Sequence, residues 1–230
     1  MSKFTNRHFQ SVCLSNDPDI DPFDLVRCCV THHSRPDDNK IVSEFFDGVT
    51  GKFLSIGAND GRDQTYELLI NGWTGVYCEP DPFACAKLIE TTKNFKDQVT
   101  ILNCSITPTG GITEFFLVLG NSFVSSLSPD WIDNHVKNTT TQRIITHSLA
   151  FSQMMAMFDY DFDYIQTDTE GYDIQIIESL DWSLVPKCKM ICTEAGPAVL
   201  KQLCQQGEYM ITDITATNSF YKHKKFVLSL

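Results

Sequence analysis

Two carboxylates, Asp168 and Glu170, directly follow a short, largely apolar run over residues 164–167. The run predicts a buried strand, so both side chains are expected at the carboxyl end of that strand. Two carboxylates one residue apart are costly to bury as charged groups unless a cation or a hydrogen-bond donor faces them. The pair therefore faces either solvent or a cation or donor in a site, and its place at a strand end favours the second interpretation.

A turn with the sequence Gly-Ala-Asn-Asp-Gly follows another apolar run, residues 53–56, and forms a second candidate. Gly57 lets the backbone turn and approach a ligand closely, since it has no Cβ. Ala58 is small, and the helix expected after the turn offers its N-terminal amides. The sequence matches neither the Gly-x-Gly-x-x-Gly pattern nor a P-loop. By itself it could also be an ordinary strand-to-helix turn.

Glu79 is the third candidate, 79 − 57 = 22 residues beyond Gly57 and directly after the apolar run 75–78. An acidic side chain at this position accepts both hydroxyls of a ribose in dinucleotide-binding folds. The alternative is a solvated loop carboxylate. Combined with the glycine turn, Glu79 favours a nucleoside-containing cofactor, without choosing between a nicotinamide and a sulfonium.

These candidates all follow expected strands, and strands alternate with helices along most of the chain. The alternation predicts a mainly parallel sheet covered on both faces, a Rossmann-like α/β sandwich that binds ligands at the carboxyl ends of its strands. A closing hairpin makes one edge antiparallel, and residues 112–119 form an antiparallel insertion. The expected strands of the main sheet are residues 53–56, 75–78, 99–104, 164–167, 189–193, 209–214 and 220–228.

Residues 1–50 differ in sequence pattern from the remainder of the chain, because they lack the alternation of expected strands and helices. Residues 17–24 are acidic and rich in turn formers, and a helix is expected to begin near Asp37 and to end at Gly48. We therefore expect residues 1–50 to be an extension of helices and loops packed on a core domain that comprises residues 51–230.

The composition is that of an acidic globular chain. Lys plus Arg number 18 and Asp plus Glu 29 among 230 residues, a formal charge of −11. Such a chain repels phosphate backbones, so nucleic acid is a poor partner. No apolar run is long enough for a membrane span and residues 1–10 lack the apolar core of a secretory signal, so a cytoplasmic location is expected. The nine cysteines are expected to be reduced and mostly buried.

Several motifs occur in an order typical of one protein family. They are residues 53–61 (Phe-Leu-Ser-Ile-Gly-Ala-Asn-Asp-Gly), 72–75 (Gly-Trp-x-Gly), 79–82 (Glu-Pro-Asp-Pro) and 163–173 (Asp-Tyr-Ile-Gln-Thr-Asp-Thr-Glu-Gly-Tyr-Asp). A strand ending at Glu194 follows in the same order. Over residues 50–230 the chain resembles the FkbM family of S-adenosylmethionine-dependent methyltransferases.

This resemblance implies a class I methyltransferase sandwich that binds S-adenosylmethionine. The methionine end of the cofactor would lie near the glycine turn, its ribose on the acidic residue after the second strand, and its adenine beside the residues after the third. Asp60 would either contact the cofactor or complement the dipole of the first helix of the core domain. The implied cofactor-binding residues are Gly57, Ala58, Asn59, Asp60, Glu79, Pro80, Cys104, Ser105 and Ile106.

Three positions depart from the family pattern. Ser55 stands where an acidic residue is common, which removes a contact to the methionine part of the cofactor. Gln166 replaces the usual Lys of the second signature, and Thr167 replaces an apolar residue. Any charge partner that the Lys would supply is therefore in doubt.

For an alcohol acceptor, a general base must lie within hydrogen-bond reach of the hydroxyl. Asp168 is the first choice because its strand end should lie nearest the methyl group, and Glu170 is the alternative unless it caps the next helix. Glu194 could join Asp168 in a divalent-metal site, although nothing in the sequence requires a metal. Residues 121–127 and Trp131 are expected on the acceptor side of the site.

These observations predict an O-methyltransferase that acts on a hydroxyl group, with a sugar, a glycan or a polyketide-like molecule as acceptor. One alternative is a nicotinamide-dependent oxidoreductase, which the missing Gly-x-Gly-x-x-Gly pattern disfavours. The other is a non-catalytic module that keeps the cofactor fold and binds a partner protein.

Overall fold

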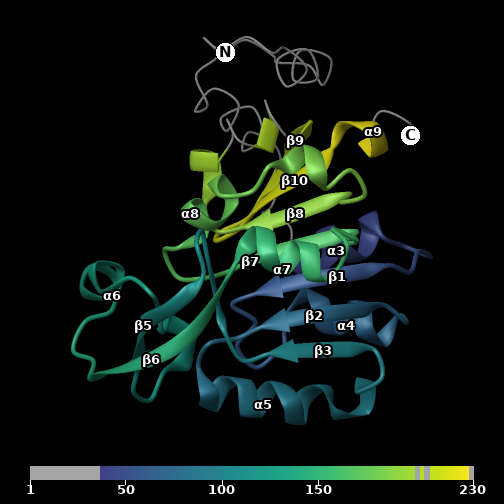
Figure 1. Cartoon of the computed structure of the whole chain (residues 1–230). Coiled ribbons are helices and arrows are strands. Elements are labelled where there is room, and N and C mark those ends of the chain that lie inside the picture. Colours follow the sequence, from purple (N-terminus) through teal and green to yellow (C-terminus); the bar gives the residue numbers. More distant parts are fainter. Residues whose placement is uncertain (1–36, 200–202, 205–207, 228–230) are drawn as a thin grey trace.

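The computed structural model describes residues 37–199, 203–204 and 208–227, and its main element is a seven-stranded sheet with the order β3-β2-β1-β7-β8-β10-β9 (Figure 1). Neighbouring strands are parallel from β3 to β8, whereas β10 lies antiparallel between β8 and β9. The strands are β1 (Lys52–Ile56), β2 (Thr74–Cys78), β3 (Val99–Leu102), β7 (Tyr164–Thr167), β8 (Met190–Thr193), β9 (Tyr209–Ile214) and β10 (Ser219–His223).

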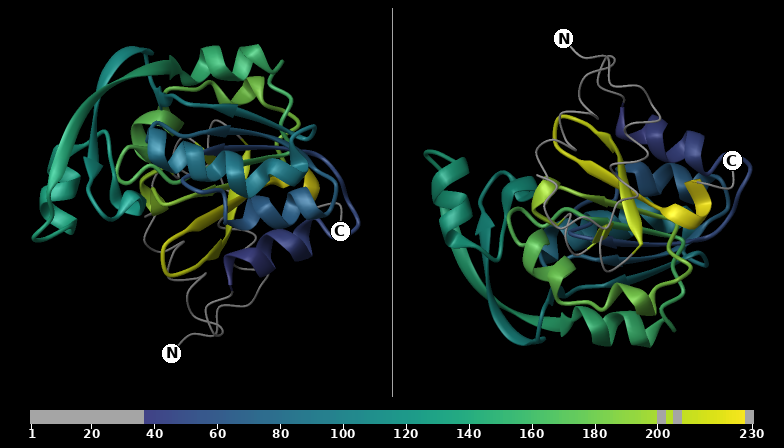
Figure 2. Two further views of the ribbon diagram at one scale, coloured as in Figure 1. Left: turned by 90° about the horizontal axis from the view of Figure 1, so that it is seen from below. Right: turned by 90° about the horizontal axis from the view of Figure 1, so that it is seen from above.

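The direction in which successive strands are added reverses between β1 and β7, and ligands bind at such a reversal in open α/β sheets. Helices lie on both faces of the sheet; Figure 2 shows α7 on one side and α3 on the other. The α-helices that cover the sheet are α3 (Asp38–Phe45), α4 (Gln64–Ile70), α5 (Pro82–Thr92), α7 (Phe151–Met157) and α8 (Asp173–Glu178). The prediction of a Rossmann-like α/β sandwich is confirmed.

Two apolar cores form because successive residues of a strand point to opposite faces. On β1, Phe53 packs with α3, α4 and α5, whereas Leu54 and Ile56 pack with α7 and α8. Three of the helices, α3, α4 and α5, begin where an aspartate caps them: the carboxylate of Asp63 accepts the N–H of Thr65 at 2.8 Å at the start of α4. These caps fix the turns between strand ends and helices, where the site lies.

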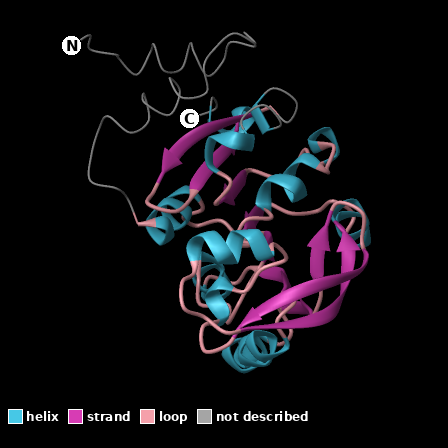
Figure 3. Ribbon diagram, turned by 90° about the vertical axis from the view of Figure 1, so that its left-hand side faces the viewer, coloured by secondary structure: helices cyan, strands magenta, loops and turns pink. Residues whose placement is uncertain are grey.

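A second sheet of three strands lies at the carboxyl ends of the parallel strands. In Figure 1 the arrowheads of β1, β2 and β3 point toward it, and Figure 3 shows it from its own side. Its order is β4-β6-β5, with β5 and β6 antiparallel as expected for an insertion. Its elements are β4 (Ser105–Thr107), β5 (Gly111–Val118), β6 (Thr141–Ala150) and, between β5 and β6, α6 (Pro129–His135).

Two expectations about strands are wrong in detail. The third strand ends at Leu102 rather than Cys104, because the chain turns at Asn103, whose side chain donates to the Glu79 carbonyl at 2.7 Å, and then enters the second sheet. The last strand ends at His223, and α9 (Lys224–Val227) follows where a strand was expected. Short 3-10 turns also occur among the described residues: η1 (Lys93–Phe95), η2 (Ser122–Val124), η3 (Trp182–Leu184) and η4 (Gly196–Val199).

The expected N-terminal extension is described only from residue 37 onward, and residues 1–36 lie outside the described residues. Within it, α3 begins after Asp37 as expected and buries Ile41 and Val42 in the core shared with α4. The division of the chain at residue 50 stays a prediction. None of the helices in the described ranges combines the length and the apolar character needed to cross a membrane.

Candidate active site

A pocket opens at the carboxyl ends of β1, β2 and β7, beneath the second sheet. About 660 Å³ of empty space lies between its walls, part of it open to solvent. One wall is formed by the main sheet and the other by β5 and the segment that follows it. The lining residues are Ile56, Gly57, Asn59, Cys78, Glu79, Pro80, Cys104, Ser105, Ile106, Phe115, Ser122, Phe123, Ser125, Leu127, Asp168, Thr169 and Glu170.

The floor of the pocket is the turn at Gly57, which brings β1, β2 and β7 together. Gly57 has a φ of +77°, and a Cβ on it would lie 1.8 Å from the carbonyl oxygen of Asp168. Its N–H donates to the Cys78 carbonyl at 2.9 Å, and the N–H of Asp168 donates to the Ile56 carbonyl at 3.0 Å. Only glycine fits this position, because any side chain would push the Asp168 backbone away from β1.

Glu79 points into the pocket from the end of β2 and is held there by backbone donors. Its Oε2 accepts the N–H of Asn59 and its Oε1 the N–H of Asp81, both at 2.7 Å. The residue is only 4% exposed, and this burial raises the pKa of Glu79 to about 7. Each oxygen keeps lone-pair capacity for a further donor, so the group can still accept the two hydroxyls of a ribose.

Three carboxylates converge on the other side of the Gly57 turn. Asp168, Glu170 and Glu194 each place an oxygen within 4.8 Å of the other two. Within the described part of the chain, none of the three forms an ion pair with a Lys, Arg or His. Burial, followed by the charge of Glu194, raises the pKa of Asp168 well above its ordinary value. The cluster therefore lacks the cation that would stabilise its ionised form.

The other two carboxylates respond to the same causes. Burial first, then the charge of Asp168, raises the pKa of Glu170 to about 8. Burial first, then the charge of Glu170, raises the pKa of Glu194 to about 7. A positively charged ligand group or a hard divalent cation, which prefers carboxylate oxygens, would relieve this repulsion.

The second sheet is attached to the loop that carries the carboxylates. Ser126 donates its hydroxyl to the Glu170 carbonyl at 2.7 Å. A Cβ on Gly171 would lie 2.3 Å from the ring of Trp131, so α6 packs directly on the backbone of this loop. Both contacts hold Glu170 in a left-handed conformation with a φ of +54°. The insertion thus positions the acidic cluster as well as covering the pocket.

Most of the residues expected to bind the cofactor line this one pocket, and two do not. Ala58 is buried beneath the turn, and Asp60 accepts the N–H of Arg62 at 3.2 Å outside the pocket. The alternative role of Asp60 at the first turn of the helix is wrong, because Asp63 is the residue that caps α4. Residues 121–127, expected on the acceptor side, contribute Ser122, Phe123, Ser125 and Leu127 to the wall of this same pocket, and their role toward an acceptor stays a prediction.

Asp63 is the residue that sequence reasoning missed. Its Oδ2 accepts the side-chain N–H of Gln166 at 3.0 Å, and the Tyr164 hydroxyl donates to the other end of that amide at 3.3 Å. Gln166, which stands where the family usually has Lys, therefore joins Asp63 to β7. Burial raises the pKa of Asp63. Its place before the helical residues 64–70 is the N-cap signal that could have identified it.

Ser55, another of the three positions that depart from the family pattern, lies inside the main sheet and not in the pocket. It is fully buried, and its hydroxyl has no hydrogen-bond partner among the described residues. The position therefore offers no carboxylate for the methionine part of a cofactor, as the sequence predicted.

Residues 55–218 match the family model described as the methyltransferase FkbM domain, which accounts for most of the chain. A mainly parallel sheet with a pocket at its reversal point and this match define the protein as an S-adenosylmethionine-dependent methyltransferase. More narrowly, the chain belongs to the FkbM methyltransferase family, in agreement with the resemblance of its motifs. No curated protein matches the sequence closely enough to count as a relative.

Solved structures with distant similarity include the METTL16 methyltransferase domain (12% identity, TM-score 0.43, 80% of this chain and 64% of that chain). Another is precorrin-6y C5,15-methyltransferase from Geobacter metallireducens GS-15 (12% identity, TM-score 0.42, 84% and 93%). A third is TrmK from M. capricolum in complex with S-adenosyl-homocysteine (11% identity, TM-score 0.40, 84% and 70%).

Proposed function

We propose that the protein transfers the methyl group of S-adenosylmethionine to a hydroxyl oxygen, with Asp168 as the general base. One observation carries the proposal: Asp168 borders two cavities, the cofactor pocket and a polar groove formed by the starts of α3 and α4 and by the β9–β10 turn. A carboxylate on such a boundary can contact both reactants, and positioning supplies much of the acceleration in a displacement reaction.

The pocket residues fit the cofactor. Glu79 offers oxygens for ribose hydroxyls, and the Gly57 turn lets a ligand approach the backbone. Cys104 to Ile106 form a small, largely apolar wall suited to an adenine. The side-chain oxygen of Asn59 is buried and has no hydrogen-bond partner among the residues that the structure describes, as expected of an atom that a bound ligand satisfies. When bound, S-adenosylmethionine supplies an electrophilic methyl group on a positively charged sulfur.

Asp168 holds the acceptor hydroxyl at the boundary and takes its proton as the oxygen is methylated. Burial and the neighbouring carboxylates favour the protonated form of Asp168, as the raised pKa indicates. A positive charge beside the cluster favours the ionised form. Asp168 therefore becomes a base when a cation occupies the pocket, and Glu170 and Glu194 contribute to the negative potential that attracts it.

The test is the variant Asp168→Asn, compared with Asp161→Asn, which removes an exposed carboxylate at the opposite end of the sheet. Isotope-labelled S-adenosylmethionine is incubated with a panel of sugars and glycans, and methylated products are measured by mass spectrometry. Loss of a general base lowers transfer by about 10²- to 10⁴-fold. Affinity for S-adenosylhomocysteine, which lacks the positive charge on sulfur, should persist in both variants and is measured by calorimetry.

Full transfer activity in Asp168→Asn would contradict the role of this residue as base without contradicting the function. If the unchanged protein binds no S-adenosylmethionine, the proposed function itself is wrong. Parallel assays with EDTA and with added Mg²⁺ decide whether the carboxylate cluster uses a divalent cation in the reaction.

A further inference from the structure

A polar groove shares Asp168 with the pocket described above. It is formed by the start of α3, the turn before α4, the end of β7 and the turn between β9 and β10. Its lining residues are Asp37, Asp38, Asn39, Arg62, Asp63, Gln64, Gln166, Asp168, Thr215, Ala216, Thr217 and Asn218. Since Asp168 is the residue common to both cavities, an acceptor in this groove would reach the proposed base.

Two buried acceptor atoms in the groove have no hydrogen-bond partner among the described residues. Gln64 is 7% exposed; its amide nitrogen donates to Oδ2 of Asp38 at 3.3 Å, and its Oε1 is left unpaired. Oδ1 of Asp38 is likewise buried and unpaired, while Asn218 donates to its Oδ2 at 2.8 Å. Buried polar atoms nearly always have a partner, so a ligand that donates hydrogen bonds is expected here.

The charges of the groove restrict that ligand further. Four carboxylates line it, Asp37, Asp38, Asp63 and Asp168, and among the described lining residues Arg62 is the only cation. A phosphorylated, sulfated or carboxylated acceptor would be repelled. The other lining side chains are amides and hydroxyls, and Ala216 is the only apolar one. An extended apolar acceptor such as a polyketide would find no matching surface.

We infer that this groove is the acceptor site and that it takes an amino alcohol of the amino-sugar class. In this arrangement the ammonium group donates to Asp38 and Gln64, and a hydroxyl of the same molecule lies beside Asp168. The inference rests on the proposed function and names the class of acceptor. An amino sugar is favoured over a neutral sugar because a neutral sugar would donate hydrogen bonds to the unpaired oxygens but would not balance the negative charge of the groove.

Binding of three sugars that share one ring tests the inference without relying on turnover. Glucosamine is cationic, N-acetylglucosamine is neutral and glucuronic acid is anionic at neutral pH. Saturation-transfer NMR on the protein loaded with S-adenosylhomocysteine measures their relative affinities. Glucosamine should bind most tightly and glucuronic acid most weakly. Equal binding of all three, tighter binding of glucuronic acid, or no binding of glucosamine would overturn the inference.

Variants decide whether the groove is the place of binding. Thr217 is an exposed turn residue of the groove, so Thr217→Lys adds a cation there with little risk to folding. We expect it to weaken glucosamine binding by roughly threefold to tenfold, through repulsion between like charges. The matched control is Thr139→Lys, an exposed position between α6 and β6. Equal effects of the two substitutions would contradict the assignment.

Asp38→Asn removes the central carboxylate of the groove, and Asp47→Asn, just beyond the end of α3, is its control for charge. Only the first should weaken glucosamine binding. Calorimetric titration with S-adenosylhomocysteine, applied to every variant, separates the two proposals. Normal cofactor binding without preference for glucosamine contradicts the acceptor class alone, whereas absence of cofactor binding contradicts the proposed function.

Discussion

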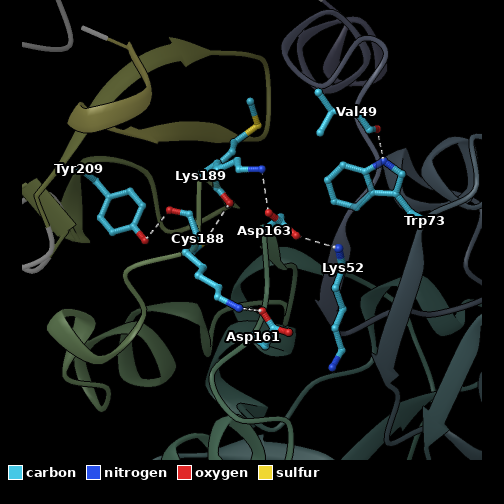
Figure 4. A network of polar contacts seen from close by, with 10 residues as sticks. Val49, Lys52, Trp73, Asp161, Asp163, Cys188, Lys189 and Tyr209 are labelled. Atoms are coloured by element: carbon cyan, nitrogen blue, oxygen red, sulfur yellow. Dashed lines mark hydrogen bonds and ion pairs between the residues drawn. The ribbon is translucent and has the colours of Figure 1, made fainter. Parts of the chain in front are cut away.

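Acidic residues at the two ends of the main sheet differ in whether they have a cationic partner. At the amino ends of the strands, Asp163 accepts the backbone N–H of Lys52 at 3.0 Å and pairs with the ammonium of Lys189 at 2.8 Å, and Asp161 pairs with Lys187 at 2.7 Å (Figure 4). At the carboxyl ends, Asp168 and the two glutamates beside it have no such partner within the described ranges.

This difference separates the parts of the sheet that serve stability from those that serve binding. Paired charges at the amino ends connect β1, β7 and β8 and largely neutralise one another. Unpaired carboxylates at the carboxyl ends repel one another, which costs folding free energy and creates a site for a cation.

The largest effect is expected for Gly57→Ala. Gly48, at the other end of β1, also has a positive φ, but nothing lies within 4 Å of a Cβ placed there, whereas at Gly57 it would meet the Asp168 carbonyl. We expect Gly57→Ala to lower the free energy of unfolding by at least about 4 kcal/mol and to abolish cofactor binding, and Gly48→Ala to cost only about 1 kcal/mol. Urea denaturation and calorimetry measure both; similar losses in the two variants would contradict the close-contact argument.

A second prediction concerns stability against pH. The pKa of Glu79 is about 7 in the folded protein against 4.5 ordinarily, so the folded state binds more protons between these values. The contribution of Glu79 to the free energy of unfolding is therefore greatest below pH 4.5. It decreases by about 3 kcal/mol in total as the pH rises from 4.5 through 7. Urea denaturation at pH 5 to 8 measures the slope, and Glu79→Gln should flatten it. An unchanged slope in that variant would show that Glu79 is not the cause.

A third prediction compares S-adenosylmethionine, which is cationic at sulfur, with neutral S-adenosylhomocysteine. The pKa values of Glu170 and Glu194 are about 8 and about 7, so the cluster gains negative charge as pH rises from 6 to 8.5. The affinity ratio of the two ligands should rise by about tenfold in favour of the cation. Calorimetric titrations measure it. Glu194→Gln should reduce the change, and a ratio independent of pH would place the sulfonium elsewhere.

The smallest effect is expected for Lys189→Gln at the amino ends. The Lys189 and Asp163 side chains are about a quarter exposed, so breaking their ion pair should cost only about 0.5 to 1 kcal/mol. Cofactor affinity should not change. A measurable loss of cofactor affinity, with normal stability, would show that the two ends of the sheet are not independent.

Local patterns were sufficient to predict the sheet and the cofactor side of the site. Each parallel strand is a short apolar run, and the residue directly after it lies at the edge where the pocket opens, which is why Gly57, Glu79 and Asp168 could be identified. The proposed binding roles of these residues stay predictions.

The groove beyond Asp168 could not be predicted because it depends on contacts between distant segments. Asp38 accepts the Asn218 amide across 180 positions, and Asp63 accepts the Gln166 amide across 103. No local periodicity records such pairs. The pairing of residues 105–107 with β6 could not be predicted either, because a three-residue strand has too few residues to show alternation.

The contacts that Ser126 and Trp131 make with the Glu170–Gly171 backbone have a consequence for turnover. The pocket wall formed by the second sheet and the acidic loop are one mechanical unit, so an outward movement of that wall large enough to release spent cofactor also displaces Glu170. Any such movement would also separate the three carboxylates, so the spacing of the charged cluster depends on the position of that wall.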